Sequence, residues 1–196
     1  MDTIIRFFWD VGSPYTYLAS TQIAALEKSH KVRFVYTPFL LGGVFKATGN
    51  EAPARNPAKG RYLFKDLNDC AQFLGVPIKF PPFFPANSLR AMRVAIWADQ
   101  VGKGREYADH LLYAYWVEGK DPSLDETIAN GLRALGLDAS TGIAAADDSA
   151  IKEQLKKLTA EAVELGAFGA PTFVIDGEIF WGHDRLPIIA SRLSQR

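Results

Sequence analysis

Residues 8–19 read Phe-Trp-Asp-Val-Gly-Ser-Pro-Tyr-Thr-Tyr-Leu-Ala, and this stretch decides the fold. The mostly apolar run Ile4–Trp9 predicts a strand, and Asp10–Gly12 predicts a turn. A helix is expected to begin at Ser13-Pro14, because proline suits the first helical position, where its missing N–H would be unpaired anyway. Apolar residues then recur at helical spacing: Tyr15, Leu18, Ala19, Ile23 and Leu26. Ser13 therefore stands at the positive end of a helix, where an anion such as a thiolate is stabilised.

The composition is that of an ordinary globular protein without a strong net charge. Among 196 residues, 22 Lys plus Arg balance 22 Asp plus Glu, so neither nucleic acid nor a membrane is expected as a partner. Cys70 is the single cysteine, which excludes an intramolecular disulfide, and the three histidines lack ligand spacing, so no metal is expected. The N-terminus lacks the basic region of a signal peptide, and no stretch approaches membrane-spanning length. A cytoplasmic protein is expected.

Two β regions flank a long helical block. Lys31–Thr37 alternates like a strand that ends at Pro38, and with the first strand and helix it predicts a βαβ unit with a right-handed crossover. The pattern then stays helical up to Phe168, apart from a polar loop at Lys46–Pro57 and a rigid Pro/Phe-rich loop. A capping box at Ser123–Glu126 is expected to open one of these helices.

The β signal returns near the C-terminus. Asp176-Gly177 lies between the apolar runs Pro171–Ile175 and Glu178–Trp181, and it is the strongest hairpin signal in the chain. A last amphipathic helix follows, with Asp184 placed to cap it. These residues alone predict an α/β protein with a helical block.

The motif Ser13-Pro14-Tyr15-Thr16 resembles the Cys-Pro-Tyr-Cys motif of DsbA-like oxidoreductases, with hydroxyls in place of both sulfurs, so no disulfide can form there. The longer pattern Ser-Pro-Tyr-x-Tyr-Leu-Ala resembles the kappa-class glutathione transferases and, more closely, the 2-hydroxychromene-2-carboxylate isomerases. Taken alone, Ser13 is more commonly a simple helix cap. The resemblance implies a thioredoxin-like fold (βαβ…ββα), with residues 1–40 and 168–196 as one domain and 41–167 as a helical insertion domain.

A second motif, Phe168–Phe173, carries the same resemblance. It implies that the Ala170–Pro171 bond is cis and faces the helix that begins after Ser13. The N–H and C=O of Ala170 would then lie at a sheet edge, where an extended peptide can pair with them. The alternative is an ordinary proline that begins a strand.

The third motif is Trp181-Gly182-His183-Asp184, followed by Arg-Leu. It resembles a Trp-Gly-Asn-Asp-Arg-Leu segment of the isomerases, with His183 where asparagine is more usual. The resemblance implies that this segment binds the γ-glutamyl end of glutathione, with Asp184 on its ammonium and backbone N–H groups on its carboxylate. The alternative is that Asp184 only caps a helix and Trp181 only packs.

A weaker likeness concerns four polar residues in loops: Lys46, Arg55, Asn56 and Asn87. In the isomerases, a Lys and an Asn-containing segment of this region hold the substrate carboxylate, and Asn87 is a further candidate for that pocket. Polar residues in loops are most often merely solvated, and this remains the alternative.

Taken together, the motifs imply a glutathione-dependent isomerase that interconverts 2-hydroxychromene-2-carboxylate and trans-o-hydroxybenzylidenepyruvate, a step in naphthalene breakdown. A thiolate adds to the conjugated carbon, the former double bond rotates, and elimination restores it, while Ser13 donates a hydrogen bond to the sulfur. The family resembled is dimeric, so a homodimer that binds a small aromatic acid is expected. Two alternatives remain: a kappa-like transferase acting on other electrophiles, and a redox-inactive thioredoxin-like binding module.

Overall fold

The computed structural model of the chain describes residues 2–195, and four strands form one mixed sheet in the order β2-β1-β3-β4. Strand β1 (Thr3–Trp9) pairs in parallel with β2 (Val32–Pro38) and antiparallel with β3 (Thr172–Ile175). Strand β4 (Glu178–Trp181) completes the hairpin with β3. The turn between them has a positive φ at both central residues, +51° at Asp176 and +82° at Gly177, as a type I′ hairpin requires. The predicted βαβ unit and hairpin are confirmed.

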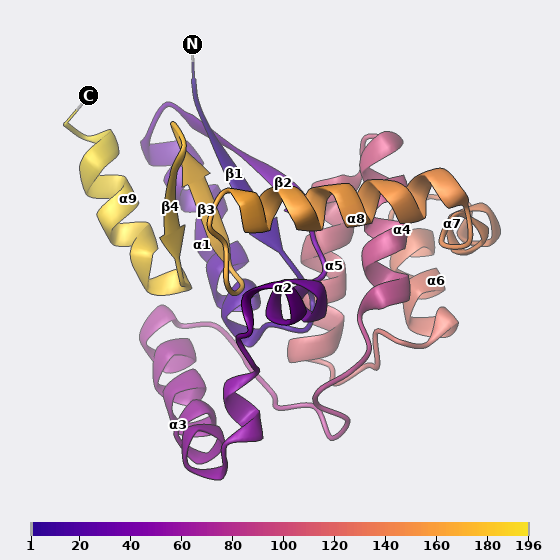
Figure 1. The fold of residues 1–196 in the computed structure, drawn as a ribbon, viewed down its shortest axis with the longest axis horizontal. Coiled ribbons are helices and arrows are strands. Elements are labelled where there is room, and N and C mark those ends of the chain that lie inside the picture. The colour runs from indigo at the N-terminus through magenta and orange to yellow at the C-terminus, as the bar shows by residue number, and fades with distance from the viewer. Residues whose placement is uncertain (1, 196) are drawn as a thin grey trace.

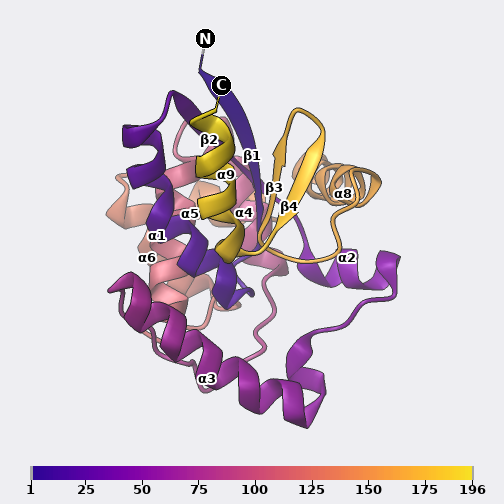
Figure 2. The same cartoon turned by 90° about the vertical axis from the view of Figure 1, so that its left-hand side faces the viewer.

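The two faces of the sheet are covered by different helices (Figure 2). Successive side chains of a strand point to opposite faces, so Phe7 and Phe8 enter separate apolar clusters. Phe7 packs on the face covered by α1 (Pro14–Ser29) and α9 (Leu186–Leu193), whereas Phe8 packs on the face covered by α8 (Ser149–Glu164).

All helices between β2 and α8 belong to the block that was expected to be helical, and Figure 1 shows α3 below the sheet and α4 to α7 to its right. Their bounds are α2 (Leu41–Thr48), η1 (Pro53–Arg55), α3 (Pro57–Leu74), α4 (Leu89–Gln100), α5 (Gly104–Trp116), α6 (Asp125–Ala134) and α7 (Ala139–Ala145). Buried residues of α5, such as Tyr107 and Leu111, belong to the same cluster as Phe7 of β1. The helical block and the sheet thus share one apolar core.

Two local predictions were wrong. The polar segment Lys46–Pro57 is not wholly a loop, because Lys46 lies in the last turn of α2 and Arg55 ends the 3₁₀ turn η1. Ser123 does not cap α6: Leu124 is the N-cap and no side chain caps it, while the Ser123 N–H donates to Asp121 Oδ1 at 2.8 Å. Within residues 2–195, none of the helices combines the length and the apolar character needed to cross a bilayer.

Candidate active site

Ser13 is the N-cap of α1, as predicted, and Pro14 occupies the first turn. Its Oγ accepts a hydrogen bond from the Thr16 N–H at 3.4 Å and donates one to the Ala170 oxygen at 2.9 Å. Ser13 is buried, with 4% of its surface exposed, and it stands 157 positions from Ala170 in the chain. The fold therefore joins the first and second motifs directly at the N-terminal end of a 16-residue helix.

The Ala170–Pro171 bond is cis, as expected, but Ala170 does not lie at an open sheet edge. Strand β3 has a neighbour on each side, β1 and β4, and Ala170 precedes it at the end of the sheet. Ala170 is 9% exposed and its carbonyl oxygen is already bound by Ser13, so the expectation of a free C=O was wrong. Its N–H has no hydrogen-bond partner among residues 2–195, which leaves one unused donor beside Ser13.

Asp10 organises the turn before Ser13, a role that the sequence reasoning missed. Its buried carboxylate accepts from the Gly12 N–H at 2.8 Å, the Leu41 N–H at 2.8 Å and the Ser88 hydroxyl at 3.1 Å. Burial raises the pKa of Asp10, and these hydrogen bonds offset part of that rise. The signal was an Asp two residues before a Gly, the pattern of an Asx turn. One carboxylate thus ties the turn to the start of α2 and to the segment before α4.

Thr16 occupies the place of the second cysteine in the related oxidoreductase motif. Its side chain is 0% exposed, and its Oγ1 has no hydrogen-bond partner among residues 2–195. The sequence predicted no role for Thr16. It indicated only that a hydroxyl replaces the second sulfur of the related motif.

Tyr15 brings two further segments to the start of α1. Its hydroxyl donates to Asp66 Oδ2 on α3 at 2.6 Å, and its ring stacks on that of His183 at a centroid distance of 5.2 Å. Burial lowers the pKa of His183, although the nearby charges of Asp184 and Asp66 oppose this shift. A neutral imidazole is therefore favoured at neutral pH. Asp66 is a second residue missed from sequence, because a carboxylate on a long helix carries no signal of its own.

Trp181 lies beside the cis-proline segment and stays accessible. The residue is 48% exposed, and its ring packs on that of Phe168 at a centroid distance of 4.8 Å. A Cβ on Gly169 would stand 2.5 Å from the Trp181 Nε1, so only glycine allows this close approach. The Gly182 N–H donates to the Pro171 oxygen at 3.0 Å, which fixes the third motif against the second.

The expectation that Asp184 caps the last helix was wrong. A 3₁₀ turn, η2 (His183–Arg185), precedes α9, whose N-cap is Arg185 without a side-chain cap. Asp184 instead pairs with the Arg185 guanidinium at 2.7 Å and remains 55% exposed. Its carboxylate is therefore accessible to a ligand.

Cys70 is near the site in space, although it is far from Ser13 in sequence. Its Sγ lies 3.9 Å from Asp66 Oδ2, the carboxylate that binds Tyr15. Burial, followed by the negative charges of Asp66 and Asp184, raises the pKa of the Cys70 thiol. A thiol in this environment is a poor nucleophile, because the thiolate is the reactive form.

The four residues predicted for the substrate are all exposed, and none of their hydrogen bonds reaches Ser13. Asn56 caps α3 by accepting from the Ala58 and Lys59 N–H groups at 3.0 and 3.2 Å. Asn87 accepts from the Leu89 N–H at 3.1 Å, and its neighbour Ser88 binds Asp10. The side chains of Lys46 and Arg55 have no hydrogen bond or ion pair among residues 2–195, although the Arg55 backbone N–H donates to the Ala52 oxygen at 3.0 Å. Their grouping into a substrate site stays a prediction.

The residues around Ser13 fit a thiol tripeptide. A sulfur anion is favoured by the positive end of the α1 dipole and by the Ser13 hydroxyl. The unused N–H of Ala170 suits a peptide carbonyl, and the exposed carboxylate of Asp184 suits an ammonium. Glutathione offers all three groups, whereas the motif Ser13-Pro14-Tyr15-Thr16 contains no sulfur.

Comparisons with known proteins agree along the whole chain. Residues 4–194 match the family model described as a DSBA-like thioredoxin domain. The 2-hydroxychromene-2-carboxylate isomerase of Pseudomonas putida is 30% identical over 194 residues, which cover 98% of this chain and 95% of that protein. Glutathione S-transferase kappa 1 of Rattus norvegicus is 26% identical over 207 residues, covering 98% and 92%.

Solved structures show the same likeness. A structure of 2-hydroxychromene-2-carboxylate isomerase superposes with a TM-score of 0.90 at 29% identity, over 98% of this chain and 95% of that one. The cytosolic disulfide reductase DsbM of Pseudomonas aeruginosa, at 16% identity and a TM-score of 0.70 over 98% of each chain, shares the fold alone. The expected α/β, thioredoxin-like fold with a helical insertion is confirmed.

Proposed function

Because the chain belongs to the DSBA-like thioredoxin-domain family, and because its full-length relatives are isomerases and glutathione transferases, we propose that it is a glutathione-dependent isomerase. It interconverts 2-hydroxychromene-2-carboxylate and trans-o-hydroxybenzylidenepyruvate in the catabolism of aromatic hydrocarbons. The observation that carries this proposal is the Ser13 hydroxyl, held at the start of α1 against Ala170 in a motif without sulfur. A hydroxyl there can orient and stabilise an anion, but it cannot exchange a disulfide.

The residues of the first motif act on the sulfur. Bound glutathione supplies a thiolate nucleophile for reversible addition to the conjugated carbon. A free thiol has a pKa near 8.5, and the N-terminus of a helix lowers it. Ser13 transfers its hydrogen bond from the Ala170 oxygen to the sulfur, and the charge-assisted bond that results is the stronger one. Pro14 leaves the helix start open by removing an N–H that has no helical partner.

The second and third motifs orient the tripeptide. The Ala170 N–H, with Pro171 keeping the segment turned toward α1, donates to a peptide carbonyl. Trp181 and Gly182 form the wall beside it, and Asp184 pairs with the glutamyl ammonium. His183, stacked on Tyr15, presents a neutral ring that accepts or donates one hydrogen bond according to its tautomer.

The substrate acid is held from the helical side. Lys46 and Arg55 supply positive charge for its carboxylate, and the side-chain amides of Asn56 and Asn87 supply donors. Support comes from Ser88, whose bond to Asp10 brings the Asn87 segment to the turn before Ser13.

We further propose that the enzyme is a cytoplasmic homodimer. Light scattering measures its mass in solution and tests the dimer.

Turnover with defined thiols tests the proposal. The absorbance change of 2-hydroxychromene-2-carboxylate is followed with glutathione, with S-methylglutathione and with no thiol. Only glutathione is expected to support turnover, because the methylated sulfur cannot ionise. Full activity without any added thiol would refute glutathione dependence.

A second candidate is a kappa-like glutathione transferase acting on other electrophiles. It is favoured by kappa-class relatives such as the kappa 1 enzyme of Caenorhabditis elegans, which is 31% identical over 206 residues and covers 97% of this chain. Both candidates use the same thiol site and differ in the electrophile. Conjugation of an aryl halide without turnover of the chromene acid would select the transferase.

A further inference from the structure

A cavity of about 520 Å³ lies along helix α8, apart from the site around Ser13. Helix α8 forms its floor from Lys152 to Glu164, and residues of α2 and α4 close its sides. None of the residues proposed to bind glutathione or the aromatic acid lines it. Its size falls within the roughly 300–1,000 Å³ typical of small-molecule sites.

The middle of the cavity is apolar. Its walls are the side chains of Leu40, Leu89, Leu155 and Val163, which come from three separate segments. Two small residues, Gly43 of α2 and Ala160 of α8, also line the cavity. At Gly43 the two helices approach closely, since a Cβ there would stand 3.0 Å from Thr159 Cγ2. An apolar body therefore finds contact on several sides, and its burial there is favourable.

One end of the cavity is cationic. Arg93 of α4 and Lys152 and Lys156 of α8 line it, while the acidic lining residue Glu164 lies 12 positions beyond Lys152. With a rise of 1.5 Å per residue, this places Glu164 about 18 Å away along the helix. The positive charges thus gather at one end, and the only carboxylate of the lining lies at the other.

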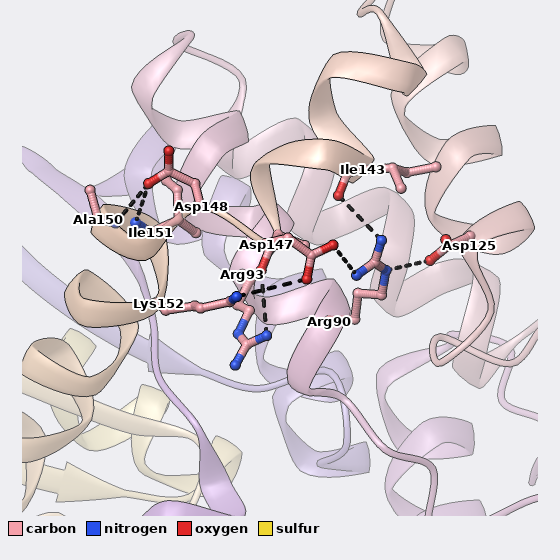
Figure 3. A network of polar contacts seen from close by, with 10 residues as sticks. Arg90, Arg93, Asp125, Ile143, Asp147, Asp148, Ala150, Ile151 and Lys152 are labelled. Atoms are coloured by element: carbon pink, nitrogen blue, oxygen red, sulfur yellow. Dashed lines mark hydrogen bonds and ion pairs between the residues drawn. The ribbon is translucent and has the colours of Figure 1, made fainter.

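The protein balances the charge at this end only in part. Lys156 pairs with Glu153 at 3.2 Å, where both side chains are 73% exposed, and Figure 3 shows the partners of Arg90, Arg93 and Lys152. The guanidinium of Arg90 is already paired with two carboxylates, Asp125 at 2.5 Å and Asp147 at 3.0 Å. Arg93, one turn later, has no ion pair within residues 2–195: its Nη1 donates weakly to the Ala146 oxygen at 3.4 Å, and its buried Nε has no partner. Lys152 reaches only the carboxylate that Arg90 already binds, at 3.9 Å.

We propose that this cavity binds an amphipathic carboxylate, such as a medium-chain fatty acid. The carboxylate lies at Arg93, Lys152 and Lys156. Guanidinium and ammonium groups form charge-assisted hydrogen bonds with a carboxylate, which are stronger than hydrogen bonds between neutral groups. The acyl chain runs along α8 over Leu155 toward Val163. Binding involves no covalent step and no group of the site around Ser13.

Calorimetric titration with decanoate tests the site, with decanol and decyltrimethylammonium at matched concentrations as probes of the head group. The expected result is one decanoate per chain, bound at least tenfold more tightly than decanol, with no measurable binding of the cation. Saturating glutathione should leave decanoate binding unchanged, because the two sites share no residue. Equal binding of the three amphiphiles, or competition by glutathione, would overturn the proposal.

Variants locate the ligand. Arg93→Met and Lys156→Met each remove a charge and are expected to weaken decanoate binding by about tenfold and about threefold. Lys157→Met, which removes an adjacent charge outside the lining, is the matched control and should bind decanoate like the parent. Ala160→Trp fills the cavity from an exposed helix position and should abolish binding even if Arg93→Met does not fold. Parent-like affinity in folded Ala160→Trp and Lys156→Met would contradict the site.

Discussion

The hydroxyl of Ser13 donates to the carbonyl oxygen of Ala170 at 2.9 Å, across 157 positions of sequence. This bond holds the start of α1 against the segment that leads into β3. It also gives Ser13 a resting partner, so a bound anion must be a better acceptor than a backbone carbonyl. A thiolate is charged and meets that condition.

Ser13→Ala is expected to lower turnover far more than glutathione affinity. The lost hydrogen bond to a charged acceptor is worth about 1.5–3 kcal/mol, or about 10- to 150-fold in rate. Steady-state kinetics with the chromene acid and calorimetry with glutathione measure the two effects separately. An equal loss in both would mean that Ser13 contributes to binding alone.

Asp184→Asn is expected to weaken glutathione binding by about fivefold, the effect of one exposed ion pair. The midpoint of thermal unfolding should barely change, since Asp184 caps no helix and its pair with Arg185 is exposed. Arg185→Gln is the matched control, because it breaks the same pair and keeps the carboxylate. If both variants bind glutathione like the parent, Asp184 has no part in the site.

Gly169→Ala is expected to displace Trp181, because the new Cβ would stand 2.5 Å from the indole nitrogen. Trp181 fluorescence should shift and glutathione binding should weaken. Gly42→Ala in α2 meets no atom within 4 Å, so it provides a control that leaves binding intact. Unchanged affinity in Gly169→Ala would remove Trp181 from the binding wall.

Cys70→Ala is expected to leave isomerisation intact while lowering the free energy of unfolding by about 1 kcal/mol through lost packing. The raised pKa of the Cys70 thiol keeps it protonated at neutral pH. Activity and urea unfolding of the variant are measured in the presence of glutathione. Loss of activity without loss of stability would make Cys70 the nucleophile.

Asp10 should make stability fall with rising pH. Its pKa is raised in the folded state, so the folded protein holds this proton more tightly than the unfolded chain. The stabilisation is complete below the unfolded value of about 3.9 and is lost as the pH rises through the folded pKa. Urea unfolding across this range should therefore show a decline in the parent that is smaller in Asp10→Ala.

The comparison between parent and Asp10→Ala is necessary because burial also raises the pKa of two other carboxyl groups, Asp99 and Asp109. The pKa of Asp109 rises to about 6, and the contributions of both groups are common to the two proteins. The difference between their unfolding free energies isolates Asp10. A difference that is constant with pH, or that grows as pH rises, would contradict the raised pKa.

The sequence predicted the parts whose signals are local. Ser13-Pro14 predicted the helix start and Asp176-Gly177 predicted the hairpin. Each of these two structures depends on the backbone preferences of two adjacent residues. The cis bond before Pro171 followed only from family resemblance. The bond between Ser13 and Ala170 needed both motifs to be placed in one fold.

What the sequence did not predict depends on contacts between distant segments. Asp66 reaches Tyr15 only because α3 packs against α1, and Asp184 failed as a cap because an extra 3₁₀ turn moved the start of α9. Ser123 does not cap α6, because the N-cap of that helix is the next residue, Leu124. The sequence gives no sign that Arg93 lacks an ion pair. Arg90, which lies one turn earlier on the same helix, is the same residue type and is fully paired.

The most direct test of the account is the pKa of the glutathione thiol on the protein, followed by the ultraviolet absorbance of the thiolate. We expect a value at least one unit below that of free glutathione in the parent, and a return toward the free value in Ser13→Ala. Thr16→Val, which removes the neighbouring hydroxyl in the same turn, is the matched control and should keep the parent value, because that hydroxyl has no proposed contact with the sulfur. A thiol pKa that is the same in parent and Ser13→Ala would contradict the role of Ser13 and, with it, the proposed mechanism.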